Sequence, residues 1–179
     1  MNKLNLGCGN DYREGYINCD CTNLVKVDKI LDLEKIPLPF KDNSIDEIIA
    51  YHILEHINNF IPLMHELHRI CKKGAKIYIK TPFYTGWGQW NDPTHVRFFS
   101  IYTFKYFQKG NYSHEVGCDK DMFNYKVKIN YAIGRASPYF NWFFNPLINL
   151  SDFTQQMYSR FFCWIFPAVE IQYVLEVIK

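Results

Sequence analysis

Two short stretches of the sequence gather side chains that could transfer protons or bind a metal. The first runs from His52 to His56 and reads HILEH, and the second runs from Asp92 to Arg97 and reads DPTHVR. Two histidines four residues apart, with a glutamate between them, match one zinc-binding pattern when they share a helix face. In the second stretch, His95 could take a proton from a substrate hydroxyl or amine. The choice between these chemistries depends on the elements that position both stretches.

The segments around HILEH decide how its side chains are presented. Short apolar segments bounded by turn residues predict strands over residues 3–6, 16–20, 27–33 and 45–51. The last strand runs directly into His52, and the isoleucines on both sides disfavour a continuous helix because they are β-branched. A zinc peptidase site needs that helix and a third ligand. Glu66 and Glu115 are candidates for this ligand, but no motif supports either of them. The sequence therefore favours a turn at the end of a strand, and we expect no bound metal.

Residues 60–71 form the clearest helical pattern in the chain. Their apolar side chains recur at three- and four-residue spacing and give one apolar stripe. Asn58 or Asn59 could cap the start of this helix, while Lys72-Lys73-Gly74 is typical of a helix end. Further elements are expected as strands over residues 76–81, 125–133 and 170–179, and as a helix over residues 101–108.

Residues 135–167 fit no strand pattern and are rich in aromatic side chains. We predict a helical insertion there, between the last two strands and within a single domain that spans residues 1–179. Three functional roles stay open for it: a cover over the active site, a surface for an apolar substrate, or a homodimer contact. A small helical core built from the same aromatic residues is the purely structural interpretation.

Strands and helices alternate over the first hundred residues, which predicts a parallel sheet with helices against its faces. Ligands of such sheets bind beyond the carboxyl ends of the strands. That edge would collect the Gly7-Cys8-Gly9 turn, Asp20, Asp32 and HILEH. The glycine turn lets a ligand come close to the backbone. Asp20 could accept hydrogen bonds from ribose hydroxyls, and Asp32 could face an adenine edge.

Five segments, taken in order, resemble the small class I S-adenosylmethionine-dependent methyltransferases. They are LNLGCGN, YINCD, ILDLEKIPLPFKDNSIDEIIAYHILEHI, LHRICKKGAKIYIKTPF and DPTHVRFFS. The resemblance runs from Leu4 to about Phe107 and implies an α/β, Rossmann-like sheet of about seven strands that binds S-adenosylmethionine. The aromatic-rich helical insertion would lie between the last two of these strands.

The resemblance also implies the residues of the site. The implied cofactor-binding residues are Leu6, Gly7, Cys8, Gly9, Asp20, Cys21, Asp32, Leu33 and His52, and the candidate catalytic residues are His95, Asp92 and His52. In one departure from the family pattern, Asp11 stands where the longer glycine signature has a third glycine. In another, about ten residues separate Gly9 from Asp20, so the first helix must be shortened to little more than a turn.

These features predict methyl transfer to a small acceptor, such as a hydroxyl of a sugar, a glycan or another metabolite. The alternatives are an RNA or protein acceptor, or a non-catalytic module that binds S-adenosylmethionine and interacts through the aromatic insertion. A net charge of +2 without a clustered basic face disfavours a nucleic-acid partner. The six cysteines contain no C-x-x-C pair, and no apolar run reaches the ~20 residues of a membrane span. We therefore expect a cytoplasmic protein.

Overall fold

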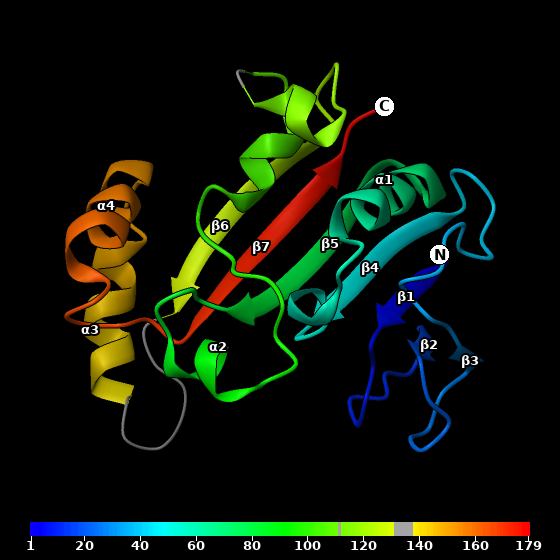
Figure 1. Cartoon of the computed structure of the whole chain (residues 1–179), viewed down its shortest axis with the longest axis horizontal. Helices are drawn as coiled ribbons and strands as arrows, with labels where there is room; N and C mark the ends of the chain where they lie inside the picture. Colours follow the sequence, from blue (N-terminus) through cyan, green and yellow to red (C-terminus); the bar gives the residue numbers. More distant parts are fainter. Residues whose placement is uncertain (111, 131–137) are drawn as a thin grey trace.

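The computed structural model describes residues 1–110, 112–130 and 138–179. Its centre is a seven-stranded sheet in the order β3-β2-β1-β4-β5-β7-β6 (Figure 1). The strands are β1 (Lys3–Leu6), β2 (Ile17–Asp20), β3 (Lys29–Ile30), β4 (Ile45–Tyr51), β5 (Cys71–Pro82), β6 (Phe123–Asn130) and β7 (Glu170–Val177). Neighbouring strands from β3 to β5 are parallel, whereas β7 runs antiparallel to both β5 and β6. The predicted Rossmann-like sheet is confirmed.

The helices are short, and several are single turns. They are η1 (Leu54–His56), α1 (Phe60–Ile70), α2 (Trp87–Asn91), η2 (Thr103–Phe107), η3 (Ser113–Val116), α3 (Pro138–Ile148), α4 (Asp152–Met157) and the π-helical turn η4 (Tyr158–Phe162). Residues 7–16, which connect β1 to β2, contain only turns and irregular chain. The shortened first helix is therefore confirmed, and the glycine turn passes into β2 without a helical crossover.

The predicted helix over residues 60–71 is α1, but both of its ends differ from the prediction. Asn59 occupies the capping position without a capping side-chain bond. The carboxylate of Glu34 instead holds the entry to the helix, because it accepts the backbone N–H groups of Asn58 at 2.7 Å and of the capping residue Asn59 at 2.9 Å. At the other end, Cys71 pairs with Ile45 and already belongs to β5. The Lys72-Lys73-Gly74 helix end was therefore a wrong prediction.

Other expected elements are shorter than their sequence patterns. β3 keeps only Lys29–Ile30 of the predicted 27–33, and the helix predicted over 101–108 is the turn η2. β6 ends at Asn130, and residues 131–133 of that predicted strand lie outside the described residues. β3 lies at the edge of the sheet and pairs with β2 alone, so fewer of its residues are held in extended pairing.

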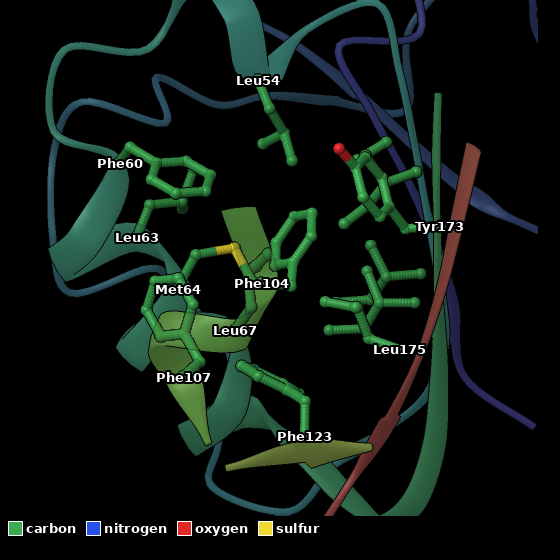
Figure 2. Close-up of a cluster of buried hydrophobic side chains, with 14 of the residues drawn as sticks. Leu54, Phe60, Leu63, Met64, Leu67, Phe104, Phe107, Phe123, Tyr173 and Leu175 are labelled. Carbon is green, nitrogen blue, oxygen red and sulfur yellow. The ribbon is translucent and has the colours of Figure 1, made fainter. Parts of the chain in front are cut away.

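The main hydrophobic core lies between α1 and the sheet (Figure 2). Leu63, Met64 and Leu67 of α1 are fully buried and face aromatic side chains from η2, β6 and β7. Phe104 packs edge-on against Tyr173, with their ring centroids 4.6 Å apart. Each large side chain buried in this way stabilises the fold by about 1.5–3 kcal/mol. This core holds α1 and η2 against the sheet.

The chain between β3 and β4 is tied to α1 by hydrogen bonds to the buried Glu66 and the partly exposed Arg69. The carboxylate of Glu66 accepts hydrogen bonds from Arg69 Nε at 2.8 Å and from the backbone N–H of Leu38 at 2.6 Å. Arg69 also donates to the carbonyl oxygens of Leu38 and Phe40. These contacts hold the segment that follows Asp32, one of the predicted ligand residues, against the helix.

Helices α3, α4 and η4 form the predicted helical insertion, of which residues 135–137 lie outside the described residues. In Figure 1 they stand at the opposite end of the sheet from β1, β2 and β3. Asn149 anchors them to β6 by exchanging hydrogen bonds with the backbone of Ile129, both at 2.7 Å. The described helices include none that is long and apolar enough to cross a membrane.

Candidate functional site

The glycine turn after β1 is shaped by close packing and by one acid. Gly7 and Gly9 have φ angles of +60° and +48°, which favour glycine. A Cβ atom at Gly7 would lie 2.5 Å from Cγ1 of Ile53, whereas one at Gly9 would meet no atom within 4 Å. The backbone N–H of Gly9 donates to the carboxylate of Asp20 at 2.9 Å. The turn is thereby held against the end of β2 and against the residues that follow β4.

A cavity of about 200 Å³ opens beside this turn, at the carboxyl edge of the parallel strands. The predicted cofactor residues that line it are Gly7, Asp20, Cys21, Asp32 and Leu33. Sequence reasoning missed the other lining residues, which are Leu31, Glu34, Ile53, His56 and Ile57. Of these, His56 carried a signal, because it belongs to HILEH and follows a strand that ends at the same edge.

The remaining predicted cofactor residues do not line this cavity. Leu6 is fully buried within β1, and the thiol of Cys8 is buried below the turn. Gly9 contributes through its hydrogen bond to Asp20 rather than by lining the cavity. His52 lies outside it, at the end of β4.

His52 bridges two buried acids. It has a left-handed φ of +53°, and its Nδ1 lies 3.4 Å from Glu55 while its Nε2 lies 3.3 Å from Glu170, the first residue of β7. These two carboxylates raise the pKa of His52 to about 9. Burial alone would raise the pKa of Glu170, but hydrogen bonds from His52, Gln172 and Asn130 lower it to about 2. His52 is therefore an ion-pair link between β4 and β7.

Asp20 and Asp32 present carboxylates to the cavity from the ends of neighbouring strands. Asp20 accepts the N–H of Gly9 through Oδ2, while its Oδ1 is 3.3 Å from the N–H of Thr22. Asp32 accepts the backbone N–H of Glu34 at 3.0 Å, and this bond, with the nearby Lys35 ammonium, lowers the pKa of Asp32. Two carboxyl groups at this edge can accept hydrogen bonds from hydroxyl or amino groups of a ligand.

The DPTHVR loop docks on η1, so it meets the second half of HILEH. The backbone N–H of Val96 donates to the carbonyl of Glu55 at 2.9 Å, and Arg97 donates to the carbonyl of Asn58 at 3.1 Å. The guanidinium of Arg97 also lies 4.8 Å from the ring centroid of Phe60. These contacts give Arg97 a structural role in holding the loop to the start of α1.

His95 and Asp92 are brought to His56 rather than to His52. The rings of His95 and His56 meet edge-on, with centroids 4.7 Å apart. Asp92 Oδ2 lies 3.8 Å from Nε2 of His95, and Asp92 Oδ1 accepts the hydroxyl of Thr94 at 2.6 Å. Hydrogen bonds from Thr94 lower the pKa of Asp92. An acid, two imidazoles and a hydroxyl are therefore brought together, and one of them, His56, lines the cavity.

Known proteins match this chain in sequence and in fold. A family model described as a methyltransferase domain matches residues 7–79. The uncharacterized protein MJ0638 of Methanocaldococcus jannaschii is 30% identical over 88 residues, which span 42% of this chain and 38% of that relative.

Solved structures share the whole fold. A methyltransferase from Archaeoglobus fulgidus that depends on S-adenosylmethionine has a TM-score of 0.64 and 16% identity, over 98% of this chain and 86% of that one. YcgJ from Bacillus subtilis has a TM-score of 0.61 and 16% identity, over 99% and 92%. Phosphoethanolamine N-methyltransferase 2 from Haemonchus contortus, in complex with S-adenosylmethionine, has a TM-score of 0.60 and 13% identity, over 99% and 48%.

The matched residues 7–79 contain the glycine turn, both cavity acids and HILEH, and the sheet around them has the fold of these enzymes. Residues 7–79 of the chain therefore match a methyltransferase domain, and the chain has the fold of S-adenosylmethionine-dependent methyltransferases.

Proposed function

We propose that this protein transfers the methyl group of S-adenosylmethionine to a hydroxyl of a small acceptor, such as a sugar, a glycan or another metabolite. The observation that carries the proposal is the cavity at the sheet edge, where the glycine turn and two carboxylates lie beside the histidines of η1 and the DPTHVR loop. The cofactor would be held on one side of this edge and the acceptor on the other.

The cavity fits the adenosine half of the cofactor. Asp20 can accept ribose hydroxyls, Asp32 can accept the adenine amino group, and Leu33 and Ile57 offer apolar contacts to the ring. The enclosed volume of about 200 Å³ is below the roughly 300–1,000 Å³ typical of small-molecule sites. We therefore place the methionine half outside the enclosed part, along the glycine turn.

The acceptor would be bound beside His95. The ring N–H at Nδ1 of His95 donates to the carbonyl of Gln89 at 3.1 Å, since a carbonyl can only accept. This leaves a lone pair on Nε2, which can take the proton of an acceptor hydroxyl, and Asp92 would stabilise the cation that forms. Methyl transfer itself needs mainly the alignment of nucleophile, methyl group and sulfur.

Calorimetric titration with S-adenosylhomocysteine tests the cofactor side. We expect micromolar binding by the wild type and binding about ten- to a hundredfold weaker in Asp20→Ala, which loses a charged hydrogen bond of roughly 1.5–3 kcal/mol. Asp121→Ala removes an exposed carboxylate that accepts the backbone N–H of Lys109 and serves as the matched control. A folded wild type that does not bind would refute the proposal.

The exposed aromatic residues of the insertion favour a second candidate, a module that binds the cofactor without catalysis and docks to another protein or to a second copy of itself. Trp142 and Trp164 are 79% and 66% exposed. Labelled methyl transfer to a panel of small hydroxyl compounds, with an RNA and a protein panel alongside, separates the candidates. Transfer to a small compound supports the enzyme with a small acceptor, and a stable dimer that binds cofactor but transfers nothing supports the module.

A further inference from the structure

Glu55, His56 and His95 form a cluster that could hold a metal ion after small movements of the side chains. One candidate ligand atom from each side chain lies within 4.8 Å of those from the other two. Glu55 and His56 come from η1, and His95 comes from the loop that is hydrogen-bonded to η1 through Val96 and Glu55. The three donors are therefore held by two segments whose relative position is fixed by the backbone.

The environment of Glu55 is the first indication that a cation belongs in the cluster. It is fully buried, and neither oxygen of its carboxylate has a hydrogen-bond partner within the described residues. Its ion-pair contact is with the half-exposed ring of His52, whose Nδ1 is 3.4 Å from Oε1. A buried carboxylate without hydrogen bonds costs free energy, and a bound cation removes that cost.

The hydrogen bonds of the two histidines are the second sign. The hydroxyl of Thr94 donates its hydrogen to Asp92 at 2.6 Å, so the contact of 2.9 Å between Thr94 Oγ1 and His56 Nδ1 requires the ring N–H to be the donor. His95 Nδ1 likewise donates to the carbonyl of Gln89. In its neutral form, each ring therefore carries its hydrogen on Nδ1 and has a lone pair on Nε2. Metal-binding histidines are oriented by such bonds from the other ring nitrogen.

We propose that Glu55, His56 and His95 bind one divalent transition-metal ion of the Zn²⁺ type. Two imidazoles and one carboxylate suit Zn²⁺ and its neighbours, whereas Mg²⁺ and Ca²⁺ prefer oxygen ligands alone. The set differs from the peptidase reading of HILEH, because His95 takes the place of His52. The peptidase geometry is absent, since η1 spans only Leu54–His56 and His52 precedes it at a left-handed φ.

The position of the site suggests its use, and this part rests on the proposed methyl transfer. His56 lines the cofactor cavity, so the ion would lie next to the bound cofactor. A ligand position left open by the three side chains could take the acceptor hydroxyl, whose deprotonation a metal ion favours. With the ion bound, the lone pair of His95 is occupied, so the ion would lower the pKa of the acceptor hydroxyl and the proton would pass to solvent water.

Zinc titration of the metal-stripped protein tests the site without any assay of activity. Calorimetry with ZnCl₂ should show one equivalent bound by the wild type. We expect His95→Ala and Glu55→Gln to bind at least about tenfold more weakly, because each loses a ligand. His114→Ala, which removes an exposed histidine of η3 outside the cluster, should bind as the wild type does. Circular dichroism and S-adenosylhomocysteine binding show that each variant is folded.

Cobalt spectroscopy separates this site from binding by thiols. Cys21 is the exposed cysteine among the described residues and lies in the cavity wall, so Cys21→Ser is the second control. The proposed site predicts Co²⁺ absorption without a thiolate charge-transfer band, and Cys21→Ser should leave it unchanged. No bound zinc, equal affinities in His95→Ala and His114→Ala, or a thiolate band would overturn the proposal. Because cofactor binding is measured on the same samples, the metal site can fail while the proposed methyl transfer stands.

Discussion

The sheet edge around the cavity buries its apolar side chains, whereas the aromatic insertion, residues 138–167, exposes many of its own. At the edge, Leu54 is fully buried, and Ile53 packs against Gly7 so closely that no side chain fits between them. In the insertion, Trp142 and Trp164 lie mostly in solvent. The first region has little freedom to change, whereas the second keeps a surface whose apolar area contributes little to the fold of this chain. The cofactor chemistry and the contacts with other molecules are therefore expected to be separable by mutation.

The largest effect is expected where the edge is tightest. Gly7→Ala places a methyl group 2.5 Å from Ile53 in a left-handed conformation, so we expect a loss of about 3 kcal/mol or more in the free energy of unfolding. Gly9→Ala is the matched control, because its φ is also positive but its Cβ meets no atom within 4 Å, and we expect about 1–2 kcal/mol. Urea unfolding measures both. Equal losses would show that the contact with Ile53 is unimportant.

The buried carboxylate of Glu66 comes next. Glu66→Ala leaves Arg69 and the N–H of Leu38 without their acceptor, and we expect a loss of about 2–3 kcal/mol in urea unfolding at neutral pH. Asp42→Ala removes the exposed carboxylate that also pairs with Arg69, and it should cost at most about 1 kcal/mol. A larger loss in Asp42→Ala than in Glu66→Ala would contradict the role of burial.

The same carboxylate predicts a dependence on pH. Hydrogen bonds from Arg69 lower the pKa of Glu66 in the folded state. Its contribution to stability is therefore fully present above the ordinary pKa of a glutamate and is lost as the pH falls through the lowered value. Unfolding measured from neutral pH into acid should show a smaller loss of stability in Glu66→Gln than in the wild type. Parallel acid profiles would refute this.

A smaller effect is expected at the start of α1. Glu34→Ala removes the acceptor of two backbone N–H groups, so we expect a loss of about 1–2 kcal/mol. Glu34→Gln keeps one acceptor oxygen and should lose less. Because Glu34 also lines the cavity, Glu34→Ala should weaken S-adenosylhomocysteine binding too, which calorimetry measures. Unchanged stability in Glu34→Ala would mean that solvent caps the helix equally well.

The smallest effect is expected in the insertion. Trp142→Ala and Trp164→Ala should each change the free energy of unfolding by no more than about 0.5 kcal/mol and leave cofactor binding intact, because both side chains are exposed. Tyr158→Ala is the contrast within the same region, since Tyr158 is 5% exposed and donates to the carbonyl of Phe166 at 2.6 Å, and we expect about 3 kcal/mol. A large loss in the tryptophan variants would show that these side chains are structural.

The parts of the fold that depend on chain order were predictable from the sequence. Gly7, Asp20 and Asp32 each follow a strand, and parallel strands end at one edge, so their meeting around one cavity required no knowledge of packing. The start of β5 was not predictable, because Lys72 and Lys73 next to Gly74 read as a helix end. Pairing of Cys71 with Ile45 overrides that local signal.

The contact between His56 and His95 was also not predictable from the sequence. Which of His52 and His56 meets His95 depends on the left-handed backbone at His52 and on the docking of Val96 onto Glu55. Neither has a sequence signature, since positive φ is uncommon for histidine and the docking joins segments far apart in the chain. HILEH indicated where the site would lie, but not which of its side chains would contact His95.

The antiparallel placement of β7 has a consequence for the order of assembly during synthesis. β7 lies between β5 and β6, and it is the only described strand to which β6 is paired. Strands β1 to β5 are contiguous along the chain and can pair as they leave the ribosome, whereas β6 must wait until the insertion and β7 have been made. Closing that long loop makes this the slow, high-contact-order step. A nascent chain stalled before Glu170 would leave the backbone groups along this edge of β5 unpaired, and we expect chaperones to bind such a chain.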